Sequence, residues 1–211
     1  MEIMGILNVT PDSFYDPSTR SHATISGQAG QVPVFSRPDS VVRFTERALQ
    51  MLSEGADIID IGGESTGPGS TEVPEDEELR RVLPVIRGIL TRQPEAVLSV
   101  DTFKAGVAEK ALAAGARMVN DVTAGRSDPE LFAVVAAAGC PYVLMRSKDP
   151  TPRTTMQETP YDDVIALIRA FFTERLAAAE RAGVRREQII LDPGLGHFVS
   201  SDPRYSWEIL E

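Results

Sequence analysis

Residues 97–121 read VLSVDTFKAGVAEKALAAGARMVND. The apolar run Val97–Val100 predicts a buried strand, and Lys104–Ala114 predicts a helix that ends at Gly115. Met118-Val119 then predicts a second short strand. Short apolar strands joined by a helix are typical of a parallel sheet covered by helices, because both faces of such a sheet are buried. This segment therefore indicates the α/β class.

The same strand-helix unit recurs along the chain. Further strands are expected at Ile6-Leu7, Asp57–Ile61, Tyr142–Met145 and Gln188–Leu191, and further helices at Pro38 to Gly55, Glu75–Leu90, Pro129–Ala138, Tyr161–Ala182 and from Asp202 onward. Residues at about 16–38 are rich in Ser, Gly, Thr and Pro, and we expect an irregular loop insertion there within a single domain spanning 1–211. Two architectures fit: an open doubly wound sheet, or a TIM-type (β/α)8 barrel with its first six units present and its C-terminal units missing.

Polar residues at the ends of the predicted strands separate these two architectures. In strand order they are Asn8, Asp60 with Glu64, Asp101, Asn120 with Asp121, Arg146 and Asp192. A barrel converges the carboxyl ends of its strands on one pocket, whereas an open sheet spreads them along an edge. Polar residues lie at the ends of all six predicted strands and would form the rim of such a pocket, which favours the barrel.

Three of these residues suggest a ligand. Asp101, Asn120 and Asp192 together offer two carboxylates and an amide, which can pair with the N–H donors and the carbonyl of a 2-amino-4-oxo heterocycle. We therefore expect a planar, nitrogen-rich ligand. Thr102 and Asp128 have a simpler interpretation, since each precedes a predicted helix and can cap it.

Composition and charge exclude other classes. The chain has 211 residues and a formal net charge of −10, which disfavours broad attraction to nucleic acid or to an anionic membrane surface. The single cysteine, Cys140, lies in the apolar stretch AAAGCPYVLM, where a buried structural residue is expected rather than a catalytic thiol. Neither a signal peptide nor a membrane-spanning run is evident. We expect a cytoplasmic protein without nucleic-acid or membrane partners.

Five motifs occur along the chain in a characteristic order. MGILNVTPDSF at residues 4–14 is followed by DIGGEST, SVDTFK, AGARMVNDV and LDPGLG. In this order and spacing the chain resembles the dihydropteroate synthase family. The resemblance implies a (β/α)8 barrel that joins 6-hydroxymethyl-7,8-dihydropterin diphosphate to p-aminobenzoate, giving 7,8-dihydropteroate and diphosphate in folate biosynthesis. Folate-dependent methyltransferases share the Asp, Asn and Asp set but not NVTPDSF and GGEST, so a methyltransferase module is the weaker interpretation.

The resemblance also implies roles for particular residues. Asp101, Asn120 and Asp192 would hold the pterin edge, Met145 would pack on the ring, Thr66 would lie beside the aminobenzoate site, and Asn8 would help to coordinate a Mg²⁺ cofactor on the leaving diphosphate. Asp101 and Asp192 are the implied catalytic residues, because they place negative charge near the cation that develops as diphosphate departs. The loop after Asn8 would be a lid, and the resemblance leaves a homodimer open.

Four positions depart from the family pattern. Gly67 replaces the arginine of GGESTRPG, Arg146 follows Met145 in place of a histidine, and His197 and Val199 stand within the usual GFGK, so that a lysine is lost. Arg146 could restore the charge missing at Gly67, and His197 could be a pocket ligand or a loop side chain. The retained pocket residues favour a synthase, whereas the lost cations favour a degenerate, non-catalytic paralogue that binds a pterin or a partner.

The end of the chain is a further departure. The two final strands of the family, which carry its remaining cationic motifs, are missing, and the chain stops within a predicted helix at residues 207–211. We expect this to be a boundary imposed on a longer protein. Six units alone would leave strand edges and part of an apolar barrel interior exposed.

Overall fold

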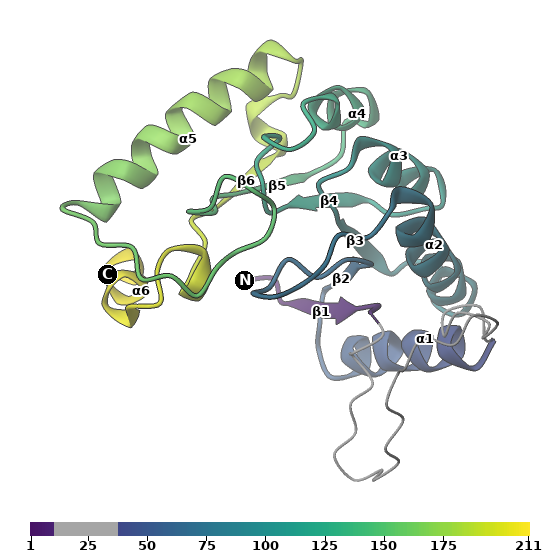
Figure 1. Cartoon of the computed structure of the whole chain (residues 1–211). Coiled ribbons are helices and arrows are strands. Elements are labelled where there is room, and N and C mark those ends of the chain that lie inside the picture. The colour runs from purple at the N-terminus through teal and green to yellow at the C-terminus, as the bar shows by residue number, and fades with distance from the viewer. Residues whose placement is uncertain (11–37) are drawn as a thin grey trace, which may run out of the picture.

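The computed structural model describes residues 1–10 and 38–211, which form one sheet flanked by helices (Figure 1). The strands are β1 (Met4–Asn8), β2 (Ile58–Gly62), β3 (Val97–Asp101), β4 (Met118–Asp121), β5 (Tyr142–Met145) and β6 (Ile189–Asp192). The helices are α1 (Pro38–Ser53), α2 (Glu75–Arg92), α3 (Ala105–Ala113), α4 (Glu130–Ala138), α5 (Val164–Arg181) and α6 (Pro203–Leu210), with 3₁₀ turns η3 (Arg186–Gln188) and η4 (Gly196–Phe198). The predicted α/β class is confirmed.

The strands follow one another in the sheet in the order β1-β2-β3-β4-β5-β6, and each neighbouring pair is parallel. A doubly wound sheet would reverse its strand order at a switch point, whereas a barrel keeps chain order throughout. Helices α1 to α4 lie in sequence along one side of the sheet (Figure 1), each in contact with the next. The chain therefore has the first six units of a TIM-type barrel, as predicted.

Alternation along the strands divides their side chains between two faces. Ile59 and Leu98 face the helices, have no exposed surface and belong to the main core. Ile58 and Val143 face the opposite way and form a small cluster on the inner side of the sheet. Every second residue up to the carboxyl end of each strand therefore points inward, which decides the composition of the site.

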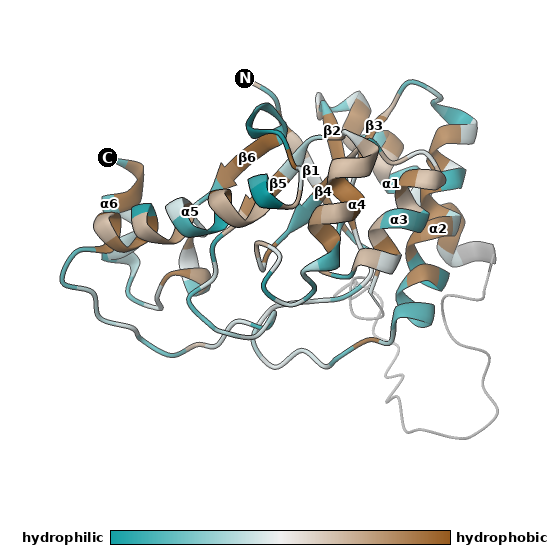
Figure 2. Cartoon of the chain, turned by 90° about the horizontal axis from the view of Figure 1, so that it is seen from above, coloured by the Kyte–Doolittle hydropathy of each residue, from teal (hydrophilic) through white to brown (hydrophobic). Residues whose placement is uncertain are grey.

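Strands β1 and β6 are the two edges of the sheet. Ile6 of β1 and Ile190 of β6 lie on the inward face and are 64% and 47% exposed. Figure 2 shows β6 in the hydrophobic colour. These features agree with the expectation that six units leave part of the barrel interior uncovered.

Two kinds of element boundary differ from the sequence prediction. Helix α5 begins at Val164 rather than Tyr161, because the Asp163 carboxylate accepts a hydrogen bond from Ala166 N at 2.7 Å and caps the helix there. Asp101 and Asn120 belong to β3 and β4 rather than following them, since the two residues pair in register. The predicted loop insertion at about 16–38 lies outside the described residues except for Pro38, the first residue of α1.

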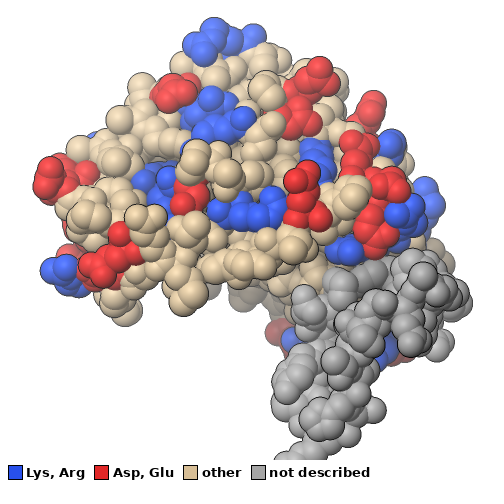
Figure 3. Space-filling model, in the orientation of Figure 1, with Lys and Arg blue, Asp and Glu red and all other residues tan. Residues whose placement is uncertain are grey.

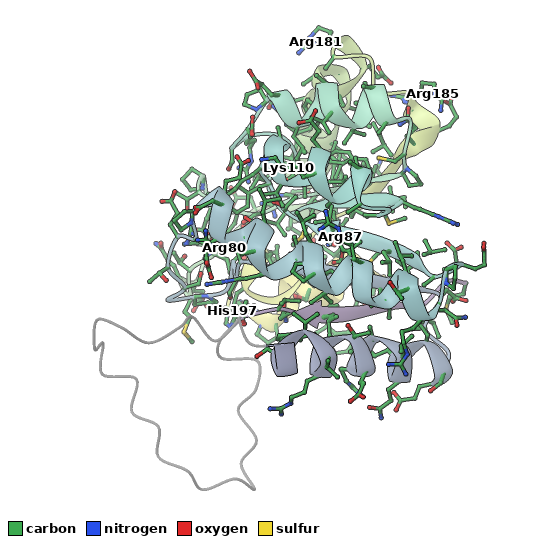
Figure 4. The ribbon with its side chains drawn as sticks, turned by 90° about the vertical axis from the view of Figure 1, so that its right-hand side faces the viewer. Arg80, Arg87, Lys110, Arg181, Arg185 and His197 are labelled. Atoms are coloured by element: carbon green, nitrogen blue, oxygen red, sulfur yellow. The ribbon has the colours of Figure 1, made fainter. Side chains whose placement is uncertain are left out.

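Charged side chains on the described surface are mixed in sign. On the face drawn in Figure 3, acidic and basic groups are interspersed. Arg80 of α2 and Lys110 of α3 point away from the sheet (Figure 4) and form ion pairs with Asp76 at 2.8 Å and with Glu75 at 3.2 Å. These exposed pairs each contribute little to stability.

Candidate functional site

The carboxyl ends of all six strands line one pocket of about 450 Å³. Every strand contributes a residue near its carboxyl end, namely Asn8, Asp60, Asp101, Asn120, Met145 and Asp192, and β1 adds Ile6. The loop after β2 adds Glu64, Ser65, Thr66 and Gly67. The six residues predicted to contact substrate, Asn8, Thr66, Asp101, Asn120, Met145 and Asp192, are therefore brought together, and their individual roles stay predictions.

Strand alternation excludes two other rim residues from the pocket. Asp121 follows the inward Asn120 and faces the helices, where its carboxylate accepts hydrogen bonds from the Tyr142 hydroxyl and Thr123 N, each at 2.7 Å. Arg146 follows the inward Met145, and its guanidinium lies 3.4 Å from the Tyr161 hydroxyl.

Arg146 is also only 3% exposed and stacks over the Tyr161 ring at 5.6 Å. Its side chain is thus held on the outer side of the strand. The structure does not support the hypothesis that Arg146 replaces the charge missing at Gly67.

Asp60 and Asn120 are joined across β3 by a hydrogen bond. Asn120 Nδ2 donates to Asp60 Oδ2 at 2.7 Å. The other oxygens, Asp60 Oδ1 and Asn120 Oδ1, are buried and have no partner among the residues that the structure describes. Buried acceptors without donors are rare, so they mark places where a ligand or water donates. Sequence reasoning placed Asp60 at a strand end but not in the ligand set, although a carboxylate within the buried run IIDIG was an available signal.

Asp101 has an unusual electrostatic environment. Burial raises its pKa well above the ordinary value, and the negative charges of Asp60, Glu78 and Asp121 raise the pKa further. A ligand that brings N–H donors or developing positive charge stabilises the ionised form of such a buried carboxyl group. Carboxyl groups with raised pKa values are concentrated at functional sites.

The turn after β6 orients Asp192. Gly194 N donates to Asp192 Oδ1 at 2.8 Å. Gly194 has a φ of +69°, and a Cβ there would collide with the carbonyl oxygen of Arg146. Only glycine therefore fits this turn, which explains the fourth residue of the motif LDPG.

Glu64 ties the loop after β2 to two other loops at the rim. Lys104, which follows β3, places Nζ 2.5 Å from Glu64 Oε2, and Arg153, which follows β5, contacts the other carboxylate oxygen. Thr154 N also donates to the Thr66 carbonyl at 2.9 Å. Sequence reasoning identified Glu64 as a rim residue but missed both of its cationic partners, because no local pattern links segments so far apart.

Among the described residues that line the pocket, none is a lysine or an arginine. Gly67 lines it without charge, and Val199 is fully buried in the core. His197 is exposed on the loop after β6 (Figure 4), and its carbonyl accepts a hydrogen bond from Thr154 at 2.7 Å. His197 is therefore a loop side chain rather than a pocket ligand in this structure.

Asn8 is the predicted metal-binding residue, and it lines the pocket. In residues 1–10 and 38–211, no group of three His, Cys, Asp or Glu side chains could hold a metal ion. Mg²⁺ usually keeps several waters and binds through few protein oxygens together with substrate phosphates. The amide oxygen of Asn8 fits a Mg²⁺ ion of that kind.

Two expectations from composition can be compared with the structure. Cys140 is buried, and burial raises the pKa of its thiol, so the reactive thiolate is disfavoured there. None of the helices in the described part of the chain combines the length and apolar character needed to cross a bilayer. Cys140 is therefore a structural residue, as predicted.

Comparison with known proteins agrees with the fold. Residues 36–211 match the family described as pterin binding enzyme. The dihydropteroate synthase of Escherichia coli is 40% identical over 205 residues, which are 97% of this chain and 65% of that protein.

Two solved structures extend this comparison. A Yersinia pestis dihydropteroate synthase, in a sulfonamide drug complex, has a TM-score of 0.79 at 37% identity. The match covers 99% of this chain and 68% of the Yersinia pestis chain. The Xanthomonas albilineans enzyme with 4-aminobenzoic acid has a TM-score of 0.79 at 41% identity. The match covers 99% of this chain and 66% of the Xanthomonas albilineans chain.

The inward-facing strand ends and the family match together define a pterin-binding barrel. The chain belongs to the dihydropteroate synthase family. It spans about two thirds of the length of the Escherichia coli, Yersinia pestis and Xanthomonas albilineans proteins.

Proposed function

We propose that the chain carries the pterin site of a dihydropteroate synthase, which condenses 6-hydroxymethyl-7,8-dihydropterin diphosphate with p-aminobenzoate. One observation carries the proposal: Asp101, Asn120 and Asp192 meet in a single pocket with Asn8, Thr66 and Met145. The bound 4-aminobenzoic acid of the Xanthomonas albilineans relative supports the second substrate.

The chemistry of this reaction suits the charges in the pocket. The bond between the pterin methylene carbon and the diphosphate oxygen breaks, and its electron pair leaves with diphosphate. The aminobenzoate nitrogen then bonds to that carbon and releases one proton. Asp101 and Asp192 stabilise the positive charge that develops on the pterin, because fixed carboxylates in a partly buried pocket act more strongly than in water.

The remaining predicted residues bind the substrates and orient them for the reaction. Met145 ends β5 on the inward face and provides an apolar surface for a flat ring. Thr66 lies in the loop that Glu64 fixes, so its position beside the second substrate is held by the rim. Asn8 would help to hold Mg²⁺, which when bound would neutralise charge on the leaving diphosphate.

A second candidate function rests on a different observation. The described lining of the pocket contains no lysine or arginine, and a diphosphate group bound there would lack a cationic side chain from this part of the chain. On its own, this part of the chain is therefore suited to binding the pterin ring without turnover.

One experiment separates the two functions. Diphosphate release from dihydropterin diphosphate and Mg²⁺ is measured with the 211-residue chain, with and without p-aminobenzoate, while pterin binding is followed by calorimetry. Release that requires p-aminobenzoate supports the synthase. Pterin binding without release supports the non-catalytic binder, and the absence of pterin binding contradicts both.

The same proposal includes a cytoplasmic location and leaves a homodimer open. The single cysteine is consistent with a reducing compartment. Sedimentation of the purified chain over a range of concentrations would determine its oligomeric state.

A further inference from the structure

The side-chain amide of Asn120 has a defined orientation. Its Nδ2 donates to Asp60 Oδ2 at 2.7 Å, and Asp60 is only 3% exposed. An ionised carboxylate can only accept hydrogen bonds, so the amide must turn its nitrogen toward Asp60. The amide oxygen is consequently directed to the other side, where it has no partner among the described residues.

Asn120 is part of the pocket wall. Asn120, Asp60 and Asp101 all line the cavity, and Asp101 is the register partner of Asn120 on the adjacent strand. The wall formed by β3 and β4 thus offers acceptors, a carboxylate from one strand and an amide oxygen from the other. A flat ligand edge with N–H groups complements this wall, whereas an edge with a carbonyl or a bare ring nitrogen meets only acceptors.

The position of Asp60 is fixed by the parallel sheet. It lies in register between Ile6 of β1 and Ser99 of β3. Burial raises the pKa of Asp60, while the hydrogen bond from the Asn120 amide lowers it and so favours the ionised form. The contact with Asn120 therefore orients the amide and also stabilises the charge that orients it.

We propose that Asp60 is a positioning residue that holds the Asn120 amide with its oxygen toward the pocket, so that the site selects heterocycles presenting N–H donors at this wall. This inference rests on the proposed function, because it concerns the same pterin-class ligand. It adds a determinant of specificity: Asp60 acts through Asn120 and decides which side of the amide the ligand meets.

The test uses two pairs of small pteridine ligands. The two members of each pair differ in one hydrogen-bond donor. Pterin carries a 2-amino group that pteridin-4(3H)-one lacks, and 7,8-dihydropterin carries an N8–H group where pterin has a bare N8. Affinities of all three ligands are measured by calorimetry for the wild type and for Asp60→Asn. The asparagine is nearly isosteric, but it can donate as well as accept, so it no longer fixes the orientation of Asn120.

We expect the wild type to prefer the donor ligand of at least one pair by about tenfold or more, because a buried acceptor left without a donor is strongly disfavoured. In Asp60→Asn this preference should fall to within about threefold, since Asn120 can turn its nitrogen toward the acceptor ligand. The double variant Asp60→Asn with Asn120→Asp should recover the preference, because residue 60 then donates and residue 120 presents a carboxylate oxygen to the pocket.

Asp121→Asn is the matched control. Asp121 is fully buried and hydrogen-bonded, but it faces the helices and not the pocket. This variant should lose stability without a change in the ratio of affinities within either pair.

Other results would overturn the inference. If Asp60→Asn weakens all three ligands by the same factor, Asp60 has only a structural or general electrostatic role, and the assignment of specificity fails while the proposed function stands. The inference also fails if the wild type binds these ligands without a donor preference. A wild type that binds none of them contradicts the proposed function as well.

Discussion

The ammonium nitrogen of Lys104 lies 2.5 Å from a carboxylate oxygen of Glu64, although the two residues are 40 positions apart in the chain. The side chains are 15% and 2% exposed, so this ion pair is shielded from water. Lys104 also contacts Glu78 Oε2 at 2.6 Å. The loops after β2 and β3 are thereby fixed to each other and to α2 beside the pocket.

Lys104→Met should destabilise the fold by about 3–5 kcal/mol, because it leaves the buried carboxylate of Glu78 without its cation and removes one of the two cations of Glu64. Urea unfolding followed by circular dichroism measures the change. Lys110→Met is the control, since Lys110 and Glu75 form a pair that is 52% and 46% exposed, and it should change stability by less than about 1 kcal/mol. Equal effects of the two substitutions would contradict the central role of Lys104.

Asp101→Asn should weaken pterin binding by roughly tenfold to a hundredfold without loss of the fold, because it replaces a pocket acceptor by a group with a misplaced donor. Calorimetric titration with pterin gives the affinity, and circular dichroism reports the fold. Asp76→Asn, on an exposed part of α2, should leave the affinity unchanged. Unaltered binding in Asp101→Asn would remove Asp101 from the ligand set.

The same substitution should make the ligand-free chain more stable at neutral pH. The folded-state pKa of Asp101 is raised above its ordinary value of 3.8, so the folded state binds more protons than the unfolded state between these two values. The contribution of Asp101 to the free energy of unfolding therefore falls as the pH rises from the ordinary pKa to the raised pKa. At higher pH this contribution stays low. Asparagine removes this dependence.

Urea unfolding at a series of pH values tests this sign. Asp202→Asn is a control of opposite direction, because hydrogen bonds from Arg204 lower the pKa of Asp202, and its contribution is present above pH 3.8 and lost as the pH falls. A decrease in neutral-pH stability for Asp101→Asn would show that Asp101 is well compensated in the folded chain.

Gly67→Arg should strengthen binding of pterin ligands that carry diphosphate. A Cβ at this position would meet only Ser65 Oγ, at 3.5 Å, so a side chain can be added without collision, and stability should change by no more than about 0.5 kcal/mol. The measurement is the ratio of affinities for the diphosphate ester and for 6-hydroxymethylpterin. Gly67→Met adds similar length without charge and should leave this ratio unchanged. If both variants alter the ratio equally, the effect is not electrostatic.

Removal of Mg²⁺ with EDTA should weaken binding of the diphosphate ester but not of 6-hydroxymethylpterin, because the metal fits the site as a partner of substrate phosphates. Asn8→Ala should reduce the difference between the two conditions. Titration calorimetry with and without Mg²⁺ gives the comparison. A metal effect of the same size on both ligands would exclude the proposed position of Mg²⁺ at Asn8.

The order of the units and the residues at the strand ends could be read from the sequence, because both depend on patterns that are local in the chain. Short, mainly apolar runs of two to five residues predicted the six strands, and the polar residues that close them predicted the rim. Asn8, Asp101, Asn120 and Asp192 were identified in this way, whereas Met145 and Thr66 were predicted from the resemblance to the family. All six line the pocket. The amino-acid sequence by itself thus determined the fold class and the polar strand ends that line the pocket.

The tertiary structure decided which rim residues face the pocket and which partners they meet. Asn120 and Asp121 are adjacent in the chain, yet only Asn120 lines the cavity, because strand register sets which face each residue occupies. The partners of Glu64 and Asn120 lie 40, 60 and 89 positions away. Such contacts depend on how strands and loops are brought together in space, and no local periodicity encodes that distance.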